Sequence, residues 1–116
     1  MTMKNSPEGR RERRKSSLPA AQQRLIELMQ QMNFGCIEGL AVVDRQPILD
    51  PPPRIIEERK FGATPGPRPE ARLDDFVLKA QQDELIQSLD EIGTGTIASL
   101  TIQAGLPFLM RFERRR

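Results

Sequence analysis

The chain has 116 residues with 18 basic and 16 acidic side chains, no histidine and one cysteine, Cys36. This length and an apolar content of 37% fit one small domain with a modest core. One cysteine excludes an internal disulfide, and no apolar run reaches the roughly 20 residues of a membrane-spanning helix. The first residues also lack the apolar stretch of a secretory signal, so we expect a cytoplasmic protein that makes no membrane contact.

The charges are distributed unevenly along the chain. Residues 1–17 carry six basic side chains against two acidic ones, and residues 111–116 carry four arginines against one glutamate. The stretch between them holds thirteen acidic and eight basic side chains. Residues 1–16 contain no apolar side chain beyond two methionines and cannot bury enough surface to offset the entropy of ordering. We therefore expect a disordered basic arm over residues 1–16, an acidic body over residues 17–113 and a basic tail over residues 114–116.

The first predicted element of the body is a helix over residues 18–32. Ser17 stands at the N-cap position, and Pro19 lies in the first turn, where its missing N–H is not needed. Apolar residues then recur at helical spacing and form one stripe. The stripe consists of Ala21, Leu25, Leu28, Met29 and Met32. Residues 33–35 are expected to end the helix, with Gly35 in the left-handed conformation.

A β-hairpin is predicted after this helix. Residues 36–43 form its first strand, residues 44–46 its turn, and Pro47 opens a short return strand. The sequence DPPP at residues 50–53 stops strand pairing, because proline donates no backbone hydrogen bond. Residues 54–61 are predicted to be extended again, as a continuation of the return strand or as an edge strand.

A second helix is predicted to begin at Asp74 or Asp75, either of which can cap it, and to end near Ile92. The alternative for residues 76–78 is a short strand. Residues 93–95, Gly-Thr-Gly, break the helix before a second hairpin begins.

The second hairpin alternates between apolar and polar residues with a period of two, which predicts one face toward a core and one toward water or a partner. The residues expected on the core side are Ala98, Leu100, Ile102, Phe108, Met110 and Phe112. The residues expected on the other side are Ser99, Thr101, Gln103, Arg111 and Glu113.

The two units also resemble each other in sequence. Sliding the chain against itself by sixty residues aligns residues 20–50 with residues 80–110 without a gap. The identical pairs are Ala20/Ala80, Gln22/Gln82, Leu25/Leu85, Ile26/Ile86, Gly35/Gly95, Ile37/Ile97, Leu40/Leu100, Pro47/Pro107 and Leu49/Leu109. We therefore expect one α+β domain of two αββ repeats, residues 17–61 and 74–113, joined by a linker at residues 62–73. The repeats are expected to form a four-stranded antiparallel sheet with two helices on one face, related by a pseudo-twofold axis.

The junction between helix and hairpin, MNFGCIEGLAVVDRQPI at residues 32–48, resembles a family of short uncharacterised bacterial proteins. Their pattern is a helix, a Phe/Tyr-Gly pair and a Val/Ile-rich hairpin with an Asp-Gly-type turn. The resemblance covers Leu25 to Phe61 and, more faintly, the second copy. This chain differs in having an Asp-Arg turn at residues 44–45 and Thr94 where the first unit has Phe34. The resemblance implies the fold and carries no established activity.

The residues give little support to catalysis. Histidine, the commonest general base and a frequent metal ligand, is absent. Cys36 therefore has no histidine to activate it, and we interpret it as a packed thiol. Neighbouring carboxylates such as Glu57 and Glu58 or Asp90 and Glu91 point in different directions and do not form a shared site. We expect a protein that is not an enzyme and that uses no metal or other cofactor.

The basic ends make nucleic acid one candidate partner, because clustered lysine and arginine side chains can contact phosphates. The candidate residues are Arg10, Arg11, Arg13, Arg14, Lys15, Arg114, Arg115 and Arg116. The acidic body opposes this interpretation, and the chain has no tyrosine or tryptophan to stack on bases. Accessory nucleic-acid binding through the arginine-rich termini is therefore the alternative hypothesis.

A small non-enzymatic binding or adaptor protein is the favoured hypothesis. A polar sheet face and an open edge at residues 55–61 can both accept a protein partner. The candidate contact residues on the face are Ser99, Thr101, Gln103 and Arg111. Self-association is the simplest version, because one surface then serves both partners. The sequence does not name the partner.

Overall fold

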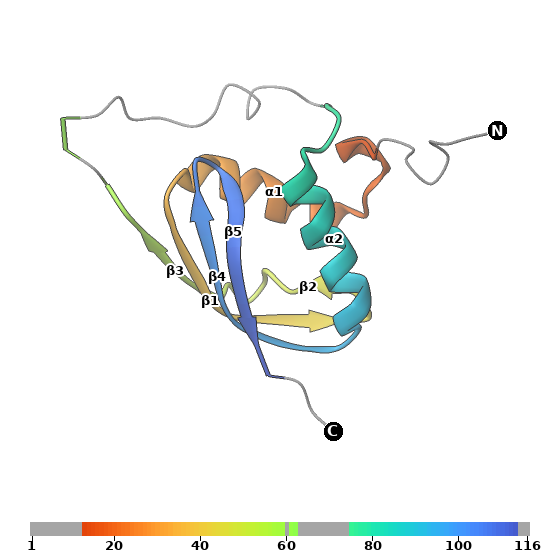
Figure 1. The fold of residues 1–116 in the computed structure, drawn as a ribbon. Coiled ribbons are helices and arrows are strands. Elements are labelled where there is room, and N and C mark those ends of the chain that lie inside the picture. The colour runs from red at the N-terminus through yellow and green to blue at the C-terminus, as the bar shows by residue number, and fades with distance from the viewer. Residues whose placement is uncertain (1–12, 60, 63–74, 114–116) are drawn as a thin grey trace.

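The computed structural model describes residues 13–59, 61–62 and 75–113. Within these residues the chain forms two α-helices, five β-strands and one short 3₁₀ helix (Figure 1). In chain order they are the 3₁₀ helix Lys15–Ser17, α1 Ala20–Met32, β1 Gly35–Val43, β2 Gln46–Pro47, β3 Arg54–Glu57, α2 Ala80–Ile92, β4 Gly95–Gln103 and β5 Leu106–Phe112. The predicted basic tail, residues 1–12 of the predicted arm and residues 63–73 of the predicted linker lie outside the described residues.

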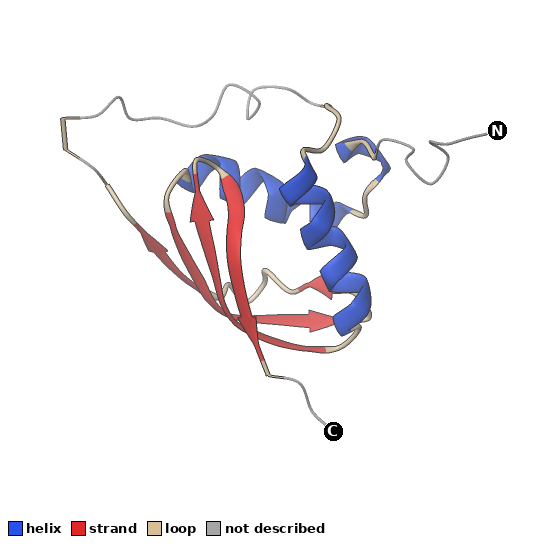
Figure 2. Cartoon of the chain, viewed as in Figure 1, coloured by secondary structure: helices blue, strands red, loops and turns tan. Residues whose placement is uncertain are grey.

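All strands join one antiparallel sheet in the order β2-β1-β4-β5. β2 pairs with the end of β1, and β3 pairs with its beginning, so both lie along the same outer edge of β1. β1 and β4 pair in the centre, and β5 forms the opposite edge. Both helices lie on one side of this sheet (Figure 2). The predicted α+β class, the antiparallel sheet and the two helices are confirmed. The strand after the triple proline continues the first edge, but it ends at Glu57 and not at residue 61.

The two layers enclose one apolar core. Both helices and the two central strands contribute to it, and Leu40, Val42, Leu100 and Ile102 belong to the same buried cluster. The side chains in this cluster are Leu18, Leu25, Ile26, Met29, Met32, Ile37, Leu40, Val42, Phe76, Leu78, Leu85, Ile86, Leu89, Ile97, Leu100 and Ile102. Fully burying one such side chain stabilises the fold by about 1.5–3 kcal/mol relative to leaving it exposed.

The central strands depart from simple alternation at one point. Ile97 and Leu100 are both buried although they are three residues apart, and Ala98 between them is exposed. The pairing of β4 with β5 is irregular at this point, as in a β-bulge. On β1 the residue facing the bulge is Gly39, whose φ of 69° lies in the left-handed region that glycine tolerates. The prediction that Ala98 faces the core is therefore wrong, because the bulge reverses the alternation.

Both helices begin later than predicted. α1 starts after Pro19, and Ser17 does not cap it, because its hydroxyl donates to the carbonyl oxygen of Arg14 instead. α2 starts at Ala80, and the side chain of Gln82 accepts a hydrogen bond from the backbone N–H of Lys79 at its first turn. Asp75 does not start the second helix, so that prediction is wrong, and Asp74 lies outside the described residues.

Residues 76–78 are extended, which matches the alternative prediction of a short strand before α2. This short strand changes the interpretation of the N-terminal arm. Val77 forms an isolated β-bridge with Arg14, between two buried neighbours, Phe76 and Leu78. The backbone N–H of Lys15 donates to the carbonyl oxygen of Phe76 at 2.9 Å. Residues 13–16 are therefore part of the fold, and the predicted boundary of a disordered arm at residue 16 is wrong. Docking of the N-terminal segment is favourable because it helps to bury the side chains of Phe76 and Leu78.

Both hairpins turn in two residues that have positive φ, as in type I′ turns. The first turn is Asp44-Arg45, with φ of 52° and 69°, and the second is Ala104-Gly105, with φ of 53° and 76°. Each turn binds the end of the other unit's helix. The N–H of Arg45 donates to the carbonyl oxygen of Gly93 at 2.6 Å, and that of Gly105 donates to the carbonyl oxygen of Asn33 at 2.8 Å.

The two glycines that open the central strands are equivalent in sequence but not in environment. Asn33, with φ of 67°, takes the left-handed position that we expected for Gly35. Gly35 is needed for a different reason, because a Cβ there would overlap the carbonyl oxygen of Ile56 and lie 2.8 Å from Cε of Met32. At Gly95 the nearest atom to such a Cβ is Cγ2 of Ile92 at 3.4 Å.

We therefore predict that Gly35→Ala lowers the free energy of unfolding by about 2 kcal/mol or more, as overpacking does in a tight core. Gly95→Ala is the matched control and is expected to change it by less than about 1 kcal/mol. Urea denaturation of the two variants measures the difference. Equal losses in both variants would show that the approach of β3 to β1 is not what requires Gly35.

Candidate functional site

No element of the described residues covers the face of the sheet opposite the helices, and the side chains of this face form rows across four strands. Paired residues of neighbouring strands point to the same face, so the register gives the members of each row. One row consists of Ile56, Cys36, Thr101 and Leu109. The next row consists of Arg54, Glu38, Ser99 and Arg111. The open face, defined by these two rows, therefore combines an apolar row with a charged one.

The charged row is not balanced across the sheet. Nε of Arg54 lies 3.6 Å from Oε1 of Glu38, so these two charges form an ion pair at one side. Arg111 lies at the other side, is exposed, and has Ser99 as its cross-strand neighbour. Within this row, therefore, no carboxylate balances the charge of Arg111.

The structure brings together three of the four predicted partner-binding residues. Ser99, Thr101 and Arg111 lie in the two adjoining rows of the open face. Gln103 is exposed at the end of β4, where it pairs with Leu106 next to the turn. The predicted face is thus continuous for three residues, with the fourth at its margin.

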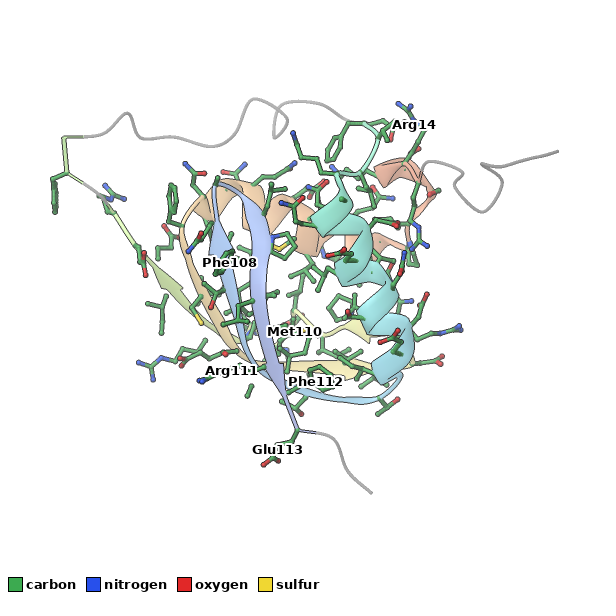
Figure 3. All side chains as sticks on the ribbon, in the orientation of Figure 1. Arg14, Phe108, Met110, Arg111, Phe112 and Glu113 are labelled. Carbon is green, nitrogen blue, oxygen red and sulfur yellow. The ribbon has the colours of Figure 1, made fainter. Side chains whose placement is uncertain are left out.

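The outer strand β5 carries apolar side chains that the core does not cover. Phe108 is 64% exposed, Leu109 53% and Phe112 37%. Met110 is half-buried beside Leu100, its cross-strand neighbour. Figure 3 shows Phe108, Met110 and Phe112 along this strand, with Arg111 and Glu113 near its end. The prediction that Phe108 and Phe112 belong to a buried face is wrong: α2 packs against β5 but leaves both side chains exposed, and Phe108 lies where the pairing of β5 with β4 is irregular.

The two edges of the sheet are protected to different degrees. The first edge is interrupted between β2 and β3 by residues 50–53, and β3 itself has only four residues, two of them charged. β5 has seven residues, and Arg111 is the one charged residue among them. Sequence reasoning placed the open edge at residues 55–61 and missed β5. The signal that points to β5 is a long apolar strand without acidic residues.

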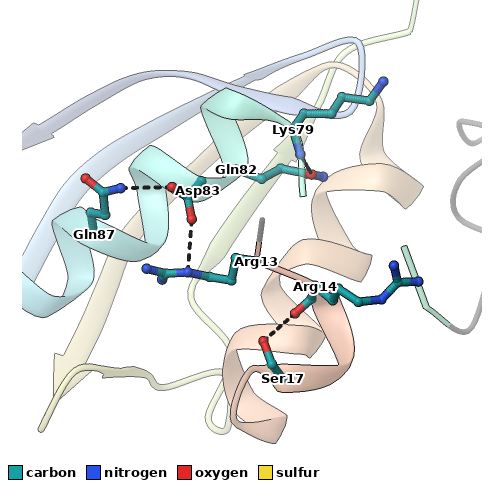
Figure 4. Close-up of polar contacts among 7 residues, drawn as sticks. All are labelled: Arg13, Arg14, Ser17, Lys79, Gln82, Asp83 and Gln87. Atoms are coloured by element: carbon teal, nitrogen blue, oxygen red, sulfur yellow. Dashed lines mark hydrogen bonds and ion pairs between the residues drawn. The ribbon is translucent and has the colours of Figure 1, made fainter. Parts of the chain in front are cut away.

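The described basic candidates for nucleic-acid binding are paired with carboxylates of the body. Nε of Arg13 lies 3.0 Å from Asp83, Nε of Arg14 lies 2.9 Å from Asp75, and Nζ of Lys15 lies 2.6 Å from Glu27. Asp83 also accepts a hydrogen bond from Gln87, so its carboxylate holds two partners (Figure 4). The remaining candidates, Arg10, Arg11, Arg114, Arg115 and Arg116, lie outside the described residues.

Lys15 is the most buried of these cations. Its side chain is 5% exposed, and its Nζ lies 5.9 Å from the centre of the Phe76 ring. An ammonium group at this distance from an aromatic ring gains a cation–π attraction in addition to the ion pair. Lys15 therefore acts as a structural anchor of the N-terminal segment and is not available to a phosphate.

The described residues contain two hollows next to β5. The larger, about 550 Å³, is lined at the end of the strand by Phe112, Glu113, Glu91 and residues 94–96, among others. A smaller one, about 120 Å³, lies between β5 and α2, with Phe108, Leu109, Glu84 and Ser88 in its lining. No cluster of three metal-ligating side chains occurs among the described residues, and Cys36 is half-buried on the open face.

The docking of the N-terminal segment depends on Asp75. Its carboxylate accepts hydrogen bonds from Nε of Arg14 and from the backbone N–H of Ser16, and these lower its pKa from 3.8 to about 2. Because the pKa in the folded state lies below the ordinary value, this stabilisation is present above about pH 4 and is lost as the pH falls toward 2.

We predict that Asp75→Asn lowers the melting temperature at neutral pH, and that this difference from the wild type disappears as the pH falls from about 4 to 2. Circular dichroism melts of the two proteins across this range measure the effect. Asp90→Asn, on the exposed face of α2, is the matched control and is expected to show no comparable pH-dependent difference. A difference between Asp75→Asn and wild type that stays constant down to pH 2 would contradict the assignment.

None of the described helices is both long and apolar enough to cross a membrane. A comparison of the chain with known protein families, with curated proteins and with solved structures finds no match. The function of this protein therefore has to be argued from the surface of its own fold.

Proposed function

We propose that this protein is a small non-enzymatic binding module that holds a protein partner on the open face of its sheet. The observation that supports this most is that the helices cover one face only, while the other carries an apolar row beside a charged row. Leu109 and Ile56, at the two ends of the apolar row, are both exposed. Apolar area bordered by polar residues is typical of protein interfaces.

The charges of the open face define the partner further. Arg54 is neutralised by Glu38, whereas Arg111 is exposed beside the uncharged Ser99. A partner that fits this face presents an apolar surface to Leu109 and a carboxylate to Arg111, because a guanidinium binds carboxylates in a defined planar geometry.

A non-enzymatic role agrees with what surrounds Cys36. Its cross-strand neighbours are Thr101 and Ile56, neither of which can take a proton from the thiol. The sequence contains no histidine, so no histidine can take the proton from the Cys36 thiol and activate it.

The nucleic-acid hypothesis gains no support from the described residues. Arg13, Arg14 and Lys15 each form an ion pair with a carboxylate. These three ion pairs would have to break before the side chains could contact phosphates. We therefore keep protein binding as the proposal and use nuclease treatment in its test.

We infer further that the two halves are copies of one helix–strand–strand unit. The two helices have 13 residues each, the two central strands have nine each, and their boundaries are offset by sixty residues. The hydrogen bond from Arg45 to Gly93 corresponds to the one from Gly105 to Asn33 under the same offset of sixty residues. Leu18 and Leu78, both buried, extend the sequence match by one more pair.

The proposed function is tested by affinity capture from nuclease-treated lysate of the native host. Wild type is compared with Arg111→Glu on the open face and with the matched control Arg24→Glu, an exposed residue of α1 on the helix side. We expect a protein that wild type and Arg24→Glu retain and that Arg111→Glu loses. Calorimetry with that recovered protein is then expected to show binding weakened roughly tenfold or more by Arg111→Glu.

Identical capture by all three proteins would contradict binding on the open face. Proteins that are captured from untreated lysate and lost after nuclease treatment would favour the arginine-rich termini instead, because nucleic acid would then hold them.

A further inference from the structure

We propose that β5 pairs with β5 of a second copy of this chain, joining two sheets edge to edge in antiparallel orientation. The proposal rests on the proposed function, because it names a partner for the uncovered part of the sheet. It concerns the outer edge of β5, whereas the open face points away from the helices.

The first argument is the unprotected state of this edge. No strand within the described residues pairs with the outer side of β5. Natural edge strands are usually short, charged or broken by proline to prevent such pairing. β5 has seven residues, Pro107 near its start and a single charge, whereas the other edge has both an interruption and charges.

The second argument is that the edge is complementary to itself. With Met110 on a twofold axis, Phe108 lies opposite Phe112 of the partner subunit, and Leu109 lies opposite Arg111 of the partner subunit. Phe108 and Leu109 are both more than half exposed. An aromatic pair across strands contributes roughly 0.5–1.5 kcal/mol beyond the area that it buries. No like charges face each other in this register.

The third argument is the charge at the two ends of β5. The start of the strand lies beside Glu84 of α2, with which Phe108 lines the smaller hollow. Near its end the strand carries Arg111, its one charged residue. Antiparallel pairing about Met110 brings Arg111 of one copy opposite Leu109 of the other, which lines the same hollow as Glu84, whereas in-register parallel pairing would place the two Arg111 side chains together. Charge complementarity therefore favours a second copy in the antiparallel sense.

The association is tested by analytical ultracentrifugation of the full chain over a roughly hundredfold range of concentration, because mass action favours a dimer at high concentration. We expect wild type to approach twice the monomer mass and Phe108→Lys to remain monomeric. Phe61→Lys is the matched control, since Phe61 is 92% exposed but lies outside the strands. Ile55→Lys, on the opposite edge, is the second control, and both controls are expected to dimerise like wild type.

The orientation is tested with single-cysteine variants in a Cys36→Ser background. Cysteines placed in turn at positions 108, 109 and 111 are treated with a short bis-maleimide, which links two thiols that lie close together. We expect crosslinking at position 109, next to the axis, to be several-fold faster than for a cysteine placed at Ile55. Crosslinking that is fastest at Ile55 would assign the contact to the other edge and overturn the proposal.

The outcomes separate this inference from the proposed function. A wild type that stays monomeric at the highest concentration, or a dimer that survives both Phe108→Lys and Leu109→Lys, overturns the pairing of β5. Capture that still depends on Arg111 in a monomeric protein leaves the proposed function standing and would identify a different protein as the partner. Circular dichroism melts of each lysine variant show that loss of the dimer is not loss of the fold.

Discussion

The pairing of β1 with β4 is the interaction on which the rest of the structure depends. The two strands keep one register from Gly35 opposite Ile102 to Val42 opposite Gly95. Each strand belongs to a different helix-and-hairpin unit, and an isolated hairpin is marginally stable in water. Their pairing produces one sheet that both helices can cover, and the buried side chains of both units then form one core.

The same pairing decides which surfaces remain uncovered. With β1 and β4 in the centre, the return strand of each hairpin becomes an edge. Because both helices lie on one side, the described part of the chain forms no second layer on the other face. The first edge is divided between β2 and β3, whereas β5 is one strand of seven residues. The open face and the β5 edge thus follow from one topological arrangement, and both proposals depend on it.

The N-terminal segment shows how a basic sequence becomes a structural element. Arg13, Arg14 and Lys15 would be ordinary solvated cations in a free tail. Here they form ion pairs with three carboxylates of the acidic body, two of which belong to the helices. Ion pairs at the surface contribute little on their own, so the burial of Leu18 and Phe76 under this segment supplies most of the docking energy.

The sequence by itself determined the elements that depend on local pattern. Helical spacing located both helices to within a few residues at their starts, and glycine, proline and alternation located the two hairpins and the break after residue 50. Tertiary structure decided the features that depend on distant partners. The bulge at Ala98 forms where Gly39 faces it, and Phe108 is exposed where the pairing of β5 with β4 is irregular. Residues 13–16 are ordered because they bind Asp75 and Phe76, which lie about sixty residues away in the sequence. Such contacts involve residues far apart in the chain, and no local periodicity records them.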